Sequence, residues 1–334
     1  VHRGRRVPHG MSASTSRAVW DAAQRPVRPL VSVIIPNWNG AHHLPVCLDS
    51  LLAQTYRHHE VIVVDNASGD DSLAVLARYP TVCTLPQERN LGFTGACNVG
   101  FRAAGGSIQV LLNNDTEVHP DWLQHVVGAF EDHPEAGIVA SKMLLFDRRD
   151  ILHTAGDYVT PDGLAHNRGI WHKDAGQYNR RAYVFSACGG SAAYRREMLE
   201  AIGLLDEDYF FSFEDIDLAW RAQLAGWRCV FEPQAIVYHK LKASGGGKTA
   251  SFYDGRNRIY TIVKNYPKDM WQDHGRAVLK AQVGLARDAL KAWRGAEARA
   301  TLRGLAAGML GIPKMLRKRR AVQAARTADR LTLE

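Results

Sequence analysis

Short apolar runs alternate with helical patterns over residues 31–115, and this alternation restricts the fold more than any other feature of the chain. Between the first two runs, Leu44, Leu48 and Leu51 recur at helical spacing. Strands that alternate with helices form a largely parallel sheet, with right-handed crossovers and helices on both faces. The sequence therefore predicts an α/β fold with strands at four runs: residues 31–35, 61–64, 81–85 and 108–112.

Polar residues follow three of these runs. Open α/β sheets bind ligands at the carboxyl ends of their strands, so oxygen-rich side chains there can hold a metal ion and phosphates. The carboxylate of Asp65 can also accept hydrogen bonds from a pyrimidine base or a ribose. The alternative is that Asp65 and Ser68 only cap the next helix. The polar residues are Pro36, Asn37 and Asn39 after the first run, Asp65 after the second, and Asn113, Asn114 and Asp115 after the fourth.

A second acidic cluster, Glu214, Asp215 and Asp217, stands at the start of a predicted helix. A carboxylate at this place can act as a general base. The alternative is that the three acids only stabilise the positive end of the helix dipole. Upstream, Gly189 and Gly190 allow a close approach of the backbone to an acceptor or a sugar ring, although a plain tight turn would need them too.

Two further segments bear on ligand binding. Residues 147–181 are polar and predict hairpins and loops on the acceptor side, where Trp171 can stack on a sugar or simply pack. Residues 245–249 resemble the end of a phosphate-binding loop, but Lys242 stands where that pattern requires glycine. We expect a glycine-rich lid there, with Lys248 or Arg256 reaching a phosphate.

The composition is that of a folded globular protein. The 334 residues are 46% hydrophobic, enough for one large core or two modest ones. Five scattered cysteines without a C-x-x-C pair argue against a zinc site or a disulfide framework and favour a reducing compartment. No run is long enough to span a bilayer, and the N-terminus lacks the apolar segment of a secretory signal. We therefore expect a cytoplasmic protein.

Positive charge is confined to the two ends of the chain. Residues 1–30 carry a net charge of +5, residues 31–270 carry −6, and residues 271–334 carry +9. A nucleic-acid enzyme would place its positive charge on the catalytic surface, so this distribution argues against a nucleic-acid partner. The pattern predicts a flexible basic leader over residues 1–30, a catalytic domain over 31–268 and a basic helical extension over 269–334.

The extension predicts amphipathic helices. Apolar residues from Leu279 to Trp293 recur at helical spacing beside a stripe of Lys and Arg, and a second helix is predicted over residues 302–310. Pro313 then precedes a basic cluster at residues 317–320. Basic amphipathic helices suit an anionic membrane surface. Packing on the catalytic domain, with a solvated basic face, is the alternative for the first helix.

Several ordered motifs together resemble the family-2 glycosyltransferases of the GT-A fold, especially the branch that includes bacterial rhamnosyltransferases. The similarity covers about residues 31–265, and several motifs at familiar spacing are far more specific than any one alone. It implies a mixed, mainly parallel central sheet with helices on both faces, a donor-nucleotide half over residues 31–115 and an acceptor half over 116–268. The motifs are VSVIIPNWN at 31–39, VVDNAS at 63–68, NLGF at 90–93 with NVG at 98–100, LLNNDT at 111–116 and FEDIDL at 213–218.

The resemblance also implies roles for single residues. Asp65 would recognise the donor base, and Asp115 would bind Mn²⁺ or Mg²⁺ across the donor diphosphate. Asn113 replaces the first aspartate of the usual Asp-x-Asp motif. His239, after a predicted strand at residues 235–238, would be a further metal ligand, and imidazole favours Mn²⁺. The remaining donor-binding residues implied by the matching motifs are Asn90, Gly92, Asn98 and Asn114.

By the same resemblance, Asp215 is the catalytic base of an inverting transfer and Glu214 contacts the acceptor. The chain is then expected to be a metal-dependent glycosyltransferase at the inner face of a bacterial membrane. It would move a sugar, best L-rhamnose from dTDP-L-rhamnose, onto a lipid-linked or cell-surface polysaccharide. A uridine-diphosphate hexose donor is one alternative. A catalytically silent sugar-nucleotide or glycan-binding protein is another, because Asn113 removes a carboxylate.

Overall fold

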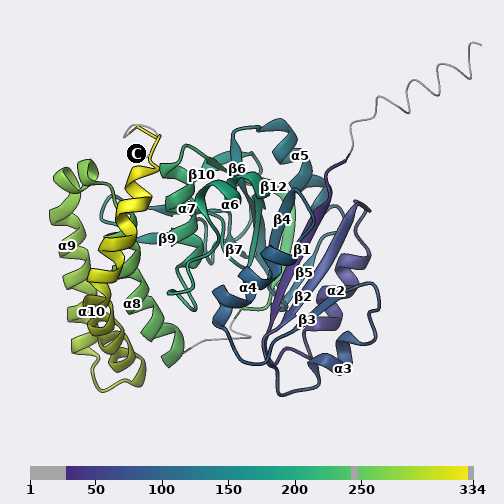
Figure 1. Cartoon of the computed structure of the whole chain (residues 1–334), viewed down its shortest axis with the longest axis horizontal. Helices are drawn as coiled ribbons and strands as arrows, with labels where there is room; N and C mark the ends of the chain where they lie inside the picture. Colours follow the sequence, from purple (N-terminus) through teal and green to yellow (C-terminus); the bar gives the residue numbers. More distant parts are fainter. Residues whose placement is uncertain (1–27, 242–246, 330–334) are drawn as a thin grey trace, which may run out of the picture.

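The computed structural model describes residues 28–241 and 247–329 (Figure 1). Most of the predicted leader, and Gly245 and Gly246 of the predicted lid, lie outside the described residues. The N-terminal half of the fold alternates strands and helices as the sequence predicts. Its elements are β1 (Val31–Asn37), α2 (Leu44–Leu52), β2 (His59–Asp65), α3 (Ser72–Leu76), β3 (Cys83–Pro86), α4 (Gly92–Ala103) and β4 (Ile108–Leu112).

The strands of this half pair in the order β3-β2-β1-β4, and every pair is parallel. The predicted third strand, residues 81–85, begins two residues later as β3. The register sets Asn37 of β1 beside Asp65 of β2. Because the strands are parallel, the polar residues that follow β1, β2 and β4 lie along one edge of the sheet.

The second half adds antiparallel strands to the same sheet. Strand β11 lies antiparallel between β4 and β6, and β12 then runs parallel to β6. The predicted strand at residues 235–238 is the end of the much longer β12. The elements are β5 (Thr116–Val118), α5 (Trp122–Asp132), β6 (Ala136–Leu145), β7 (Leu152–Thr154), β8 (Asp157–Val159), β9 (Ala165–Asn167), β10 (Ala182–Val184), β11 (Ser191–Arg195), α6 (Arg196–Ile202), α7 (Glu214–Leu224) and β12 (Arg228–His239).

Helices cover both faces of the mixed sheet, so the predicted fold class is confirmed. Alternate residues of β1 point to opposite faces, with Val33 in the core under α2 and α5 and Ile34 in the core under α4. Gly100 of α4 lies directly over Ile34: an added Cβ would stand 2.2 Å from Cγ2 of that isoleucine. This close approach fixes α4 on the sheet and so fixes its N-terminus at the strand ends.

Three helices form a layer at one end of the molecule (Figure 1). They are α8 (Lys248–Asn265), α9 (Lys268–Lys291) and α10 (Ala296–Ala324). Helix α10 lies almost against the backbone of α8, since an added Cβ on Gly304 would stand 2.1 Å from the carbonyl oxygen of Phe252. None of the helices in the described part of the chain combines the length and the apolar character needed to cross a membrane.

The second predicted helix of the extension is too short. Instead of stopping near residue 310, α10 continues through Pro313 to Ala324. A proline inside a helix removes a backbone hydrogen bond, which the sequence pattern alone treats as an end signal. Packing outweighs that loss here, because Met315 is fully buried and Lys318 forms ion pairs beyond the proline.

Candidate active site

A cavity of about 370 Å³ opens where β1 and β4 end. We call it the strand-end cavity. Parallel strands bring these ends together, so residues far apart in sequence share one wall. The predicted residues that line it are Pro36, Asn37, Asn90, Gly92, Asn113, Asn114 and Asp115, together with His239.

A chain of hydrogen bonds fixes the floor of the strand-end cavity. Asn114 donates to the Oδ1 of Asn37 over 2.7 Å, and Asn37 donates to the Oδ1 of Asp65 over 2.9 Å. The backbone N–H of Ser68 donates to the other oxygen of Asp65 over 3.2 Å. Asp65 is buried and is not among the residues that line the cavity, so its carboxylate orients Asn37 in this structure.

The N-terminus of α4 faces the same cavity. Gly92 begins the helix with φ of 76°, and an added Cβ would stand 2.5 Å from the ring of Phe210. Asn66 donates to the side-chain oxygen of Asn90 and to the carbonyl of Gly92, which holds the turn in place. Two N–H groups of this first turn already have partners, since Gly92 donates to the Oδ1 of Asn90 over 2.8 Å and Thr94 donates to the carbonyl of Phe210 over 3.3 Å.

Asp115 and His239 form a buried contact in the strand-end cavity. Strand β12 pairs antiparallel with β5, which places His239 opposite Thr116 and brings its Nε2 to 3.2 Å from the Oδ1 of Asp115. Burial alone would raise the pKa of Asp115, but the hydrogen bond with His239 and the electrostatic effect of that side chain lower it overall. Asn113 places its amide nitrogen 3.5 Å from the same Nε2.

This pair has the donor atoms that suit Mn²⁺, one carboxylate oxygen and one imidazole nitrogen. His153 approaches the far side of the imidazole, with 3.2 Å between the two Nδ1 atoms, and burial lowers the pKa of His153 to about 3. A neutral His153 can accept the Nδ1 proton of His239, which leaves Nε2 free to bind a cation. No group of three or more His, Cys, Asp or Glu side chains suited to a metal occurs in residues 28–241 and 247–329.

A second cavity, of about 310 Å³, adjoins the first. We call it the acidic cavity, because Asp157, Glu214 and Asp215 line it together with Gly189 and Gly190. The Oδ2 of Asp215 accepts a hydrogen bond from the backbone N–H of Gly189 over 2.8 Å. Burial raises the pKa of Asp215, and hydrogen bonds from the backbone N–H groups of Gly189 and Ile216 oppose that rise.

The other two acids of the acidic cavity are also buried. Burial and the neighbouring Asp215 raise the pKa of Glu214 well above its ordinary value, and the Oε2 of Glu214 has no hydrogen-bond partner among the described residues. Burial, and secondarily Asp215, raise the pKa of Asp157 to about 7. A carboxyl of this kind can accept or donate a proton near neutral pH, which is what acid–base chemistry requires.

The two cavities meet. Asn113, His153, Phe93 and Phe211 line both of them. These four side chains form the wall that the two cavities share, and Asp215 lines the acidic cavity.

The structure leaves four predicted site residues outside both cavities: the buried Asp65, and Asn39, Asn98 and Trp171. Asn39 is exposed and accepts a hydrogen bond from the backbone of Gly69. Asn98 donates to the carbonyl of Leu205, so its side chain ties α4 to the segment before α7. Trp171 is 55% exposed and lines neither cavity. The side chain of Arg256, one of the two residues predicted to reach a phosphate, donates to the carbonyls of Asp208 and Tyr209.

Several residues that line the cavities were not predicted. Three are Phe210, Phe211 and Phe213, whose place directly before the acidic cluster could have indicated that they lie at the site. His153 and Asp157 carry no comparable signal, because they come from short strands whose place in the fold the sequence does not reveal.

The mixed sheet, with helices on both faces and cavities where its strands end, is the GT-A fold. The sequence profile described as glycosyl transferase family 2 matches residues 32–203, and the chain belongs to this family. The mannosyltransferase PcManGT from Pyrobaculum calidifontis, solved in complex with GDP-Man and Mn²⁺, shares the fold with a TM-score of 0.54 and 21% identity, over 93% of this chain and 92% of that one. The S. aureus protein TarS, solved as residues 1–349 with UDP, gives 0.54 and 19% identity over 88% and 87%.

Sequence relatives point to the same family. An uncharacterized protein of Sinorhizobium fredii is 31% identical over 271 residues, 77% of this chain and 29% of that protein. The O-antigen biosynthesis protein RfbC of Myxococcus xanthus is 33% identical over 66% of this chain and 18% of its own length. The chain thus spans less than a third of these two relatives. The N-acetylglucosaminyl-diphospho-decaprenol L-rhamnosyltransferase of Mycobacterium tuberculosis is 26% identical over 78% of this chain and 91% of that protein.

Proposed function

We propose that the protein is an inverting, metal-dependent glycosyltransferase that moves a sugar from a nucleoside-diphosphate donor to a hydroxyl group. The observation that carries this proposal is the junction of the two cavities. The strand-end cavity is lined by amide side chains and by Asp115 and His239, which suit a diphosphate with its cation, and the neighbouring acidic cavity presents Asp215.

Asp215 has the position of a general base. In the proposed step its carboxylate takes the proton of the acceptor hydroxyl, and the hydroxyl oxygen forms a bond to the anomeric carbon. The bond from that carbon to the diphosphate breaks at the same time and the diphosphate leaves with both electrons. One carboxylate suffices for such a single displacement, and it inverts the anomeric configuration. The backbone N–H of Gly189 keeps the Asp215 carboxylate oriented towards the cavity.

Asp115 and His239 are the residues that would hold Mn²⁺ or Mg²⁺. When bound, the cation offsets the negative charge that develops on the leaving diphosphate. Asn113 carries no charge, so Asp115 and His239 supply all the protein ligands that we assign. The remaining positions would be filled by the donor diphosphate and water.

For the substrates we propose L-rhamnose from dTDP-L-rhamnose as the donor and a lipid-linked or cell-surface polysaccharide as the acceptor. The M. tuberculosis relative is named as an L-rhamnosyltransferase of a lipid-linked sugar, which supports rhamnose and a lipid-linked acceptor. The match to this chain covers 91% of that protein. A uridine-diphosphate hexose is the second candidate, supported by the UDP complex of TarS. Both assignments use the same two cavities.

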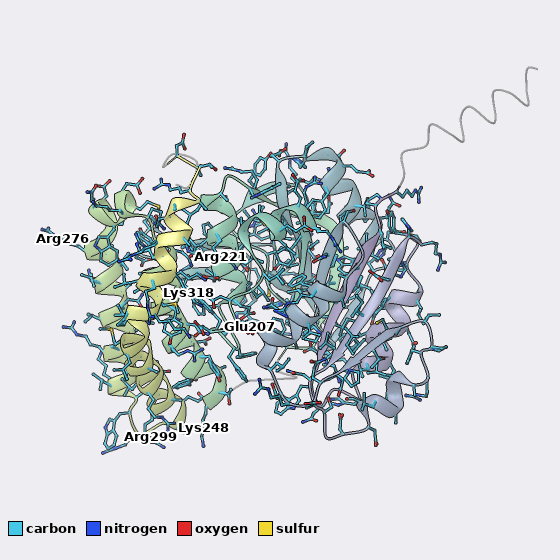
Figure 2. All side chains as sticks on the ribbon, viewed as in Figure 1. Glu207, Arg221, Lys248, Arg276, Arg299 and Lys318 are labelled. Atoms are coloured by element: carbon cyan, nitrogen blue, oxygen red, sulfur yellow. The ribbon has the colours of Figure 1, made fainter. Side chains whose placement is uncertain are left out.

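We also propose that the C-terminal extension makes a peripheral contact with the cytoplasmic face of the membrane. Leu279, Val283, Leu290 and Trp293 are between 48% and 57% exposed along α9 and the turn after it. Basic side chains flank this apolar stripe, and one of them, Arg276, projects from the outer edge of α9 (Figure 2). An exposed apolar stripe beside cations suits an anionic lipid surface. The flanking cations are Arg276, Lys280, Arg287 and Lys291.

The replacement of Asp215 by Asn tests the catalytic proposal. The amide keeps the size of the side chain but cannot accept the proton, so we expect transfer to fall by about 10²- to 10⁴-fold while binding of the nucleoside diphosphate persists. The measurement is the rate of sugar transfer from dTDP-L-rhamnose and from UDP-hexoses. Asp288→Asn, at an exposed position of α9, is the matched control. Near-normal turnover in Asp215→Asn would remove Asp215 as the base.

A further inference from the structure

The segment of residues 206–213 connects the two cavities to the C-terminal helices. We call it the aromatic loop, since it contains Tyr209, Phe210, Phe211 and Phe213. Phe210 and Phe211 line the strand-end cavity, while Phe211 and Phe213 line the acidic cavity. The loop ends directly before Glu214 and Asp215. Its conformation therefore shapes both cavities and sets where α7 begins.

The aromatic loop has an unfavourable backbone conformation. Phe210, Ser212 and Phe213 have φ values of 61°, 67° and 66°. Bulky residues rarely adopt the left-handed region, because the side chain then crowds the backbone. Three of them within four residues persist only if the surroundings hold the loop in place.

Helix α8 supplies the first set of restraints. The side-chain amide of Asn257, which is fully buried, points at three carbonyls of the loop: 3.0 Å to Tyr209, 2.8 Å to Phe211 and 2.7 Å to Ser212. Arg256 donates to the carbonyls of Asp208 and Tyr209 over 2.7 and 2.8 Å. These contacts reach four successive or near-successive carbonyls of the loop, those of Asp208, Tyr209, Phe211 and Ser212, and the one of Tyr209 also accepts the backbone N–H of Phe211.

Helix α10 supplies the second set. The Nζ of Lys318 lies 2.5 Å from Asp206 and 2.6 Å from Asp208, and the Nζ of Lys314 lies 2.5 Å from Asp208. Lys318 is labelled on α10 in Figure 2. Asp206 is also paired with Lys264 of α8 over 2.7 Å. These lysines overcome the effect of burial and hold the pKa of Asp206 well below its usual range.

The lysines of α10 join the extension to the aromatic loop by ion pairs, and Met315 of the same helix packs with Tyr209. The side chain of Asp206 is 9% exposed and that of Asp208 is 23% exposed, so both pairs with Lys318 are partly shielded from water. Shielded ion pairs are stronger than exposed ones, because solvent screens them less. The loop is thus held by two helices.

We propose that Lys318 and Lys314 are positioning residues of the active site, and that α10 holds the aromatic loop in the form that shapes both cavities. In this role the extension orders the catalytic centre in addition to any contact with a membrane. That α10 orders the loop does not depend on the proposed function. That this ordering affects sugar transfer does rest on the proposed function.

Hydrogen exchange of the full-length chain, followed by mass spectrometry, tests the ordering directly. The amides of Asp208, Tyr209 and Phe210 are hydrogen-bonded within the loop, so their exchange reports its stability. In Lys318→Met we expect exchange of peptides within residues 205–214 to rise by about tenfold, and in Lys314→Met by less, because Lys314 makes only one of the contacts. Peptides from β1 and β4 should keep their rates. Lys268→Met, at an exposed position at the start of α9 and outside the proposed lipid surface, is the matched control.

A kinetic readout separates positioning from general stability. With dTDP-L-rhamnose or a UDP-hexose as donor, Lys318→Met should lower kcat/KM, and Lys318→Arg should restore most of it because the cation is kept. Unchanged loop exchange in both methionine variants would overturn the proposal. Faster exchange across all peptides would also overturn it, since the lysine would then act on the whole fold. If no donor supports transfer in the wild type, the proposed function fails while the exchange result still decides the role of the loop.

Discussion

At the scale of single residues, the acids of the acidic cavity share the effect of burial, which raises the pKa of each, and differ in their hydrogen-bond partners. Asp215 and Asp157 both line the acidic cavity, yet only Asp215 is held by the backbone N–H of Gly189. The side chain of Asp157 instead accepts hydrogen bonds from Thr154 and Asn167 over 2.8 Å each. Asp157 is therefore an acid of the cavity wall, next to the base that we propose.

Asp157 gives a prediction on pH and stability. Its pKa of about 7 in the folded protein exceeds the ordinary value of about 3.9, so the stability that its protonated form contributes is present at acidic pH and is lost as the pH rises towards 7. Between pH 5 and pH 8 the free energy of unfolding of the wild type should fall. In Asp157→Asn we expect that fall to be smaller than in the wild type by about 1–3 kcal/mol. Urea unfolding at both pH values measures this, and an equal fall in wild type and variant would contradict it.

At the scale of elements, the strands and helices of residues 31–115 were predictable because their apolar periodicity is strong. The short strands β7, β8, β9 and β10 were not, because three residues carry no period and their pairing depends on the rest of the sheet. Helix α10 was predicted too short for a related reason, since the contacts that carry it past Pro313 are tertiary.

Two residues of the basic cluster at 317–320 bind other parts of the protein. Lys318 binds the aromatic loop and Arg319 donates to the carbonyl of Val263, so neither is free for lipid. Exposed apolar residues lie on both α9 and α10, and those of α9 have the flanking cations. We therefore propose α9, rather than the terminal cluster, as the membrane contact.

A charge placed on the α9 stripe tests the membrane contact. Leu290→Glu should weaken binding to vesicles that contain anionic lipid by at least about tenfold, because it removes an apolar group worth roughly 1.5–3 kcal/mol and adds a repelled charge. Leu73→Glu is the matched control, since Leu73 is 47% exposed on α3 at the far end of the molecule. Co-sedimentation at about 0.1 M salt is the measurement. The same binding in Leu290→Glu and wild type would argue against α9 as the lipid contact.

At the scale of the whole molecule, one sheet edge gathers residues from both halves of the chain. Asp115 follows β4, while His239 ends β12, and the pairing of β12 with β5 joins them. Sequence motifs identified most of the strand-end cavity, because its residues follow predictable strands. The contacts of Asn98 and the burial of Asp65 could not be predicted, because they depend on how the segment before α7 and the strand β1 pack in three dimensions.

The central claim is that the strand-end cavity binds a nucleoside diphosphate through a cation held by Asp115 and His239. Calorimetric titration with dTDP and with UDP, in Mn²⁺ and in EDTA, tests it most directly. We expect binding in Mn²⁺ by wild type and by Asp215→Asn, and affinity at least about tenfold weaker in EDTA or in Asp115→Asn, a loss of about 1.4 kcal/mol. Equal affinity in EDTA, or in Asp115→Asn with Mn²⁺, would contradict the account.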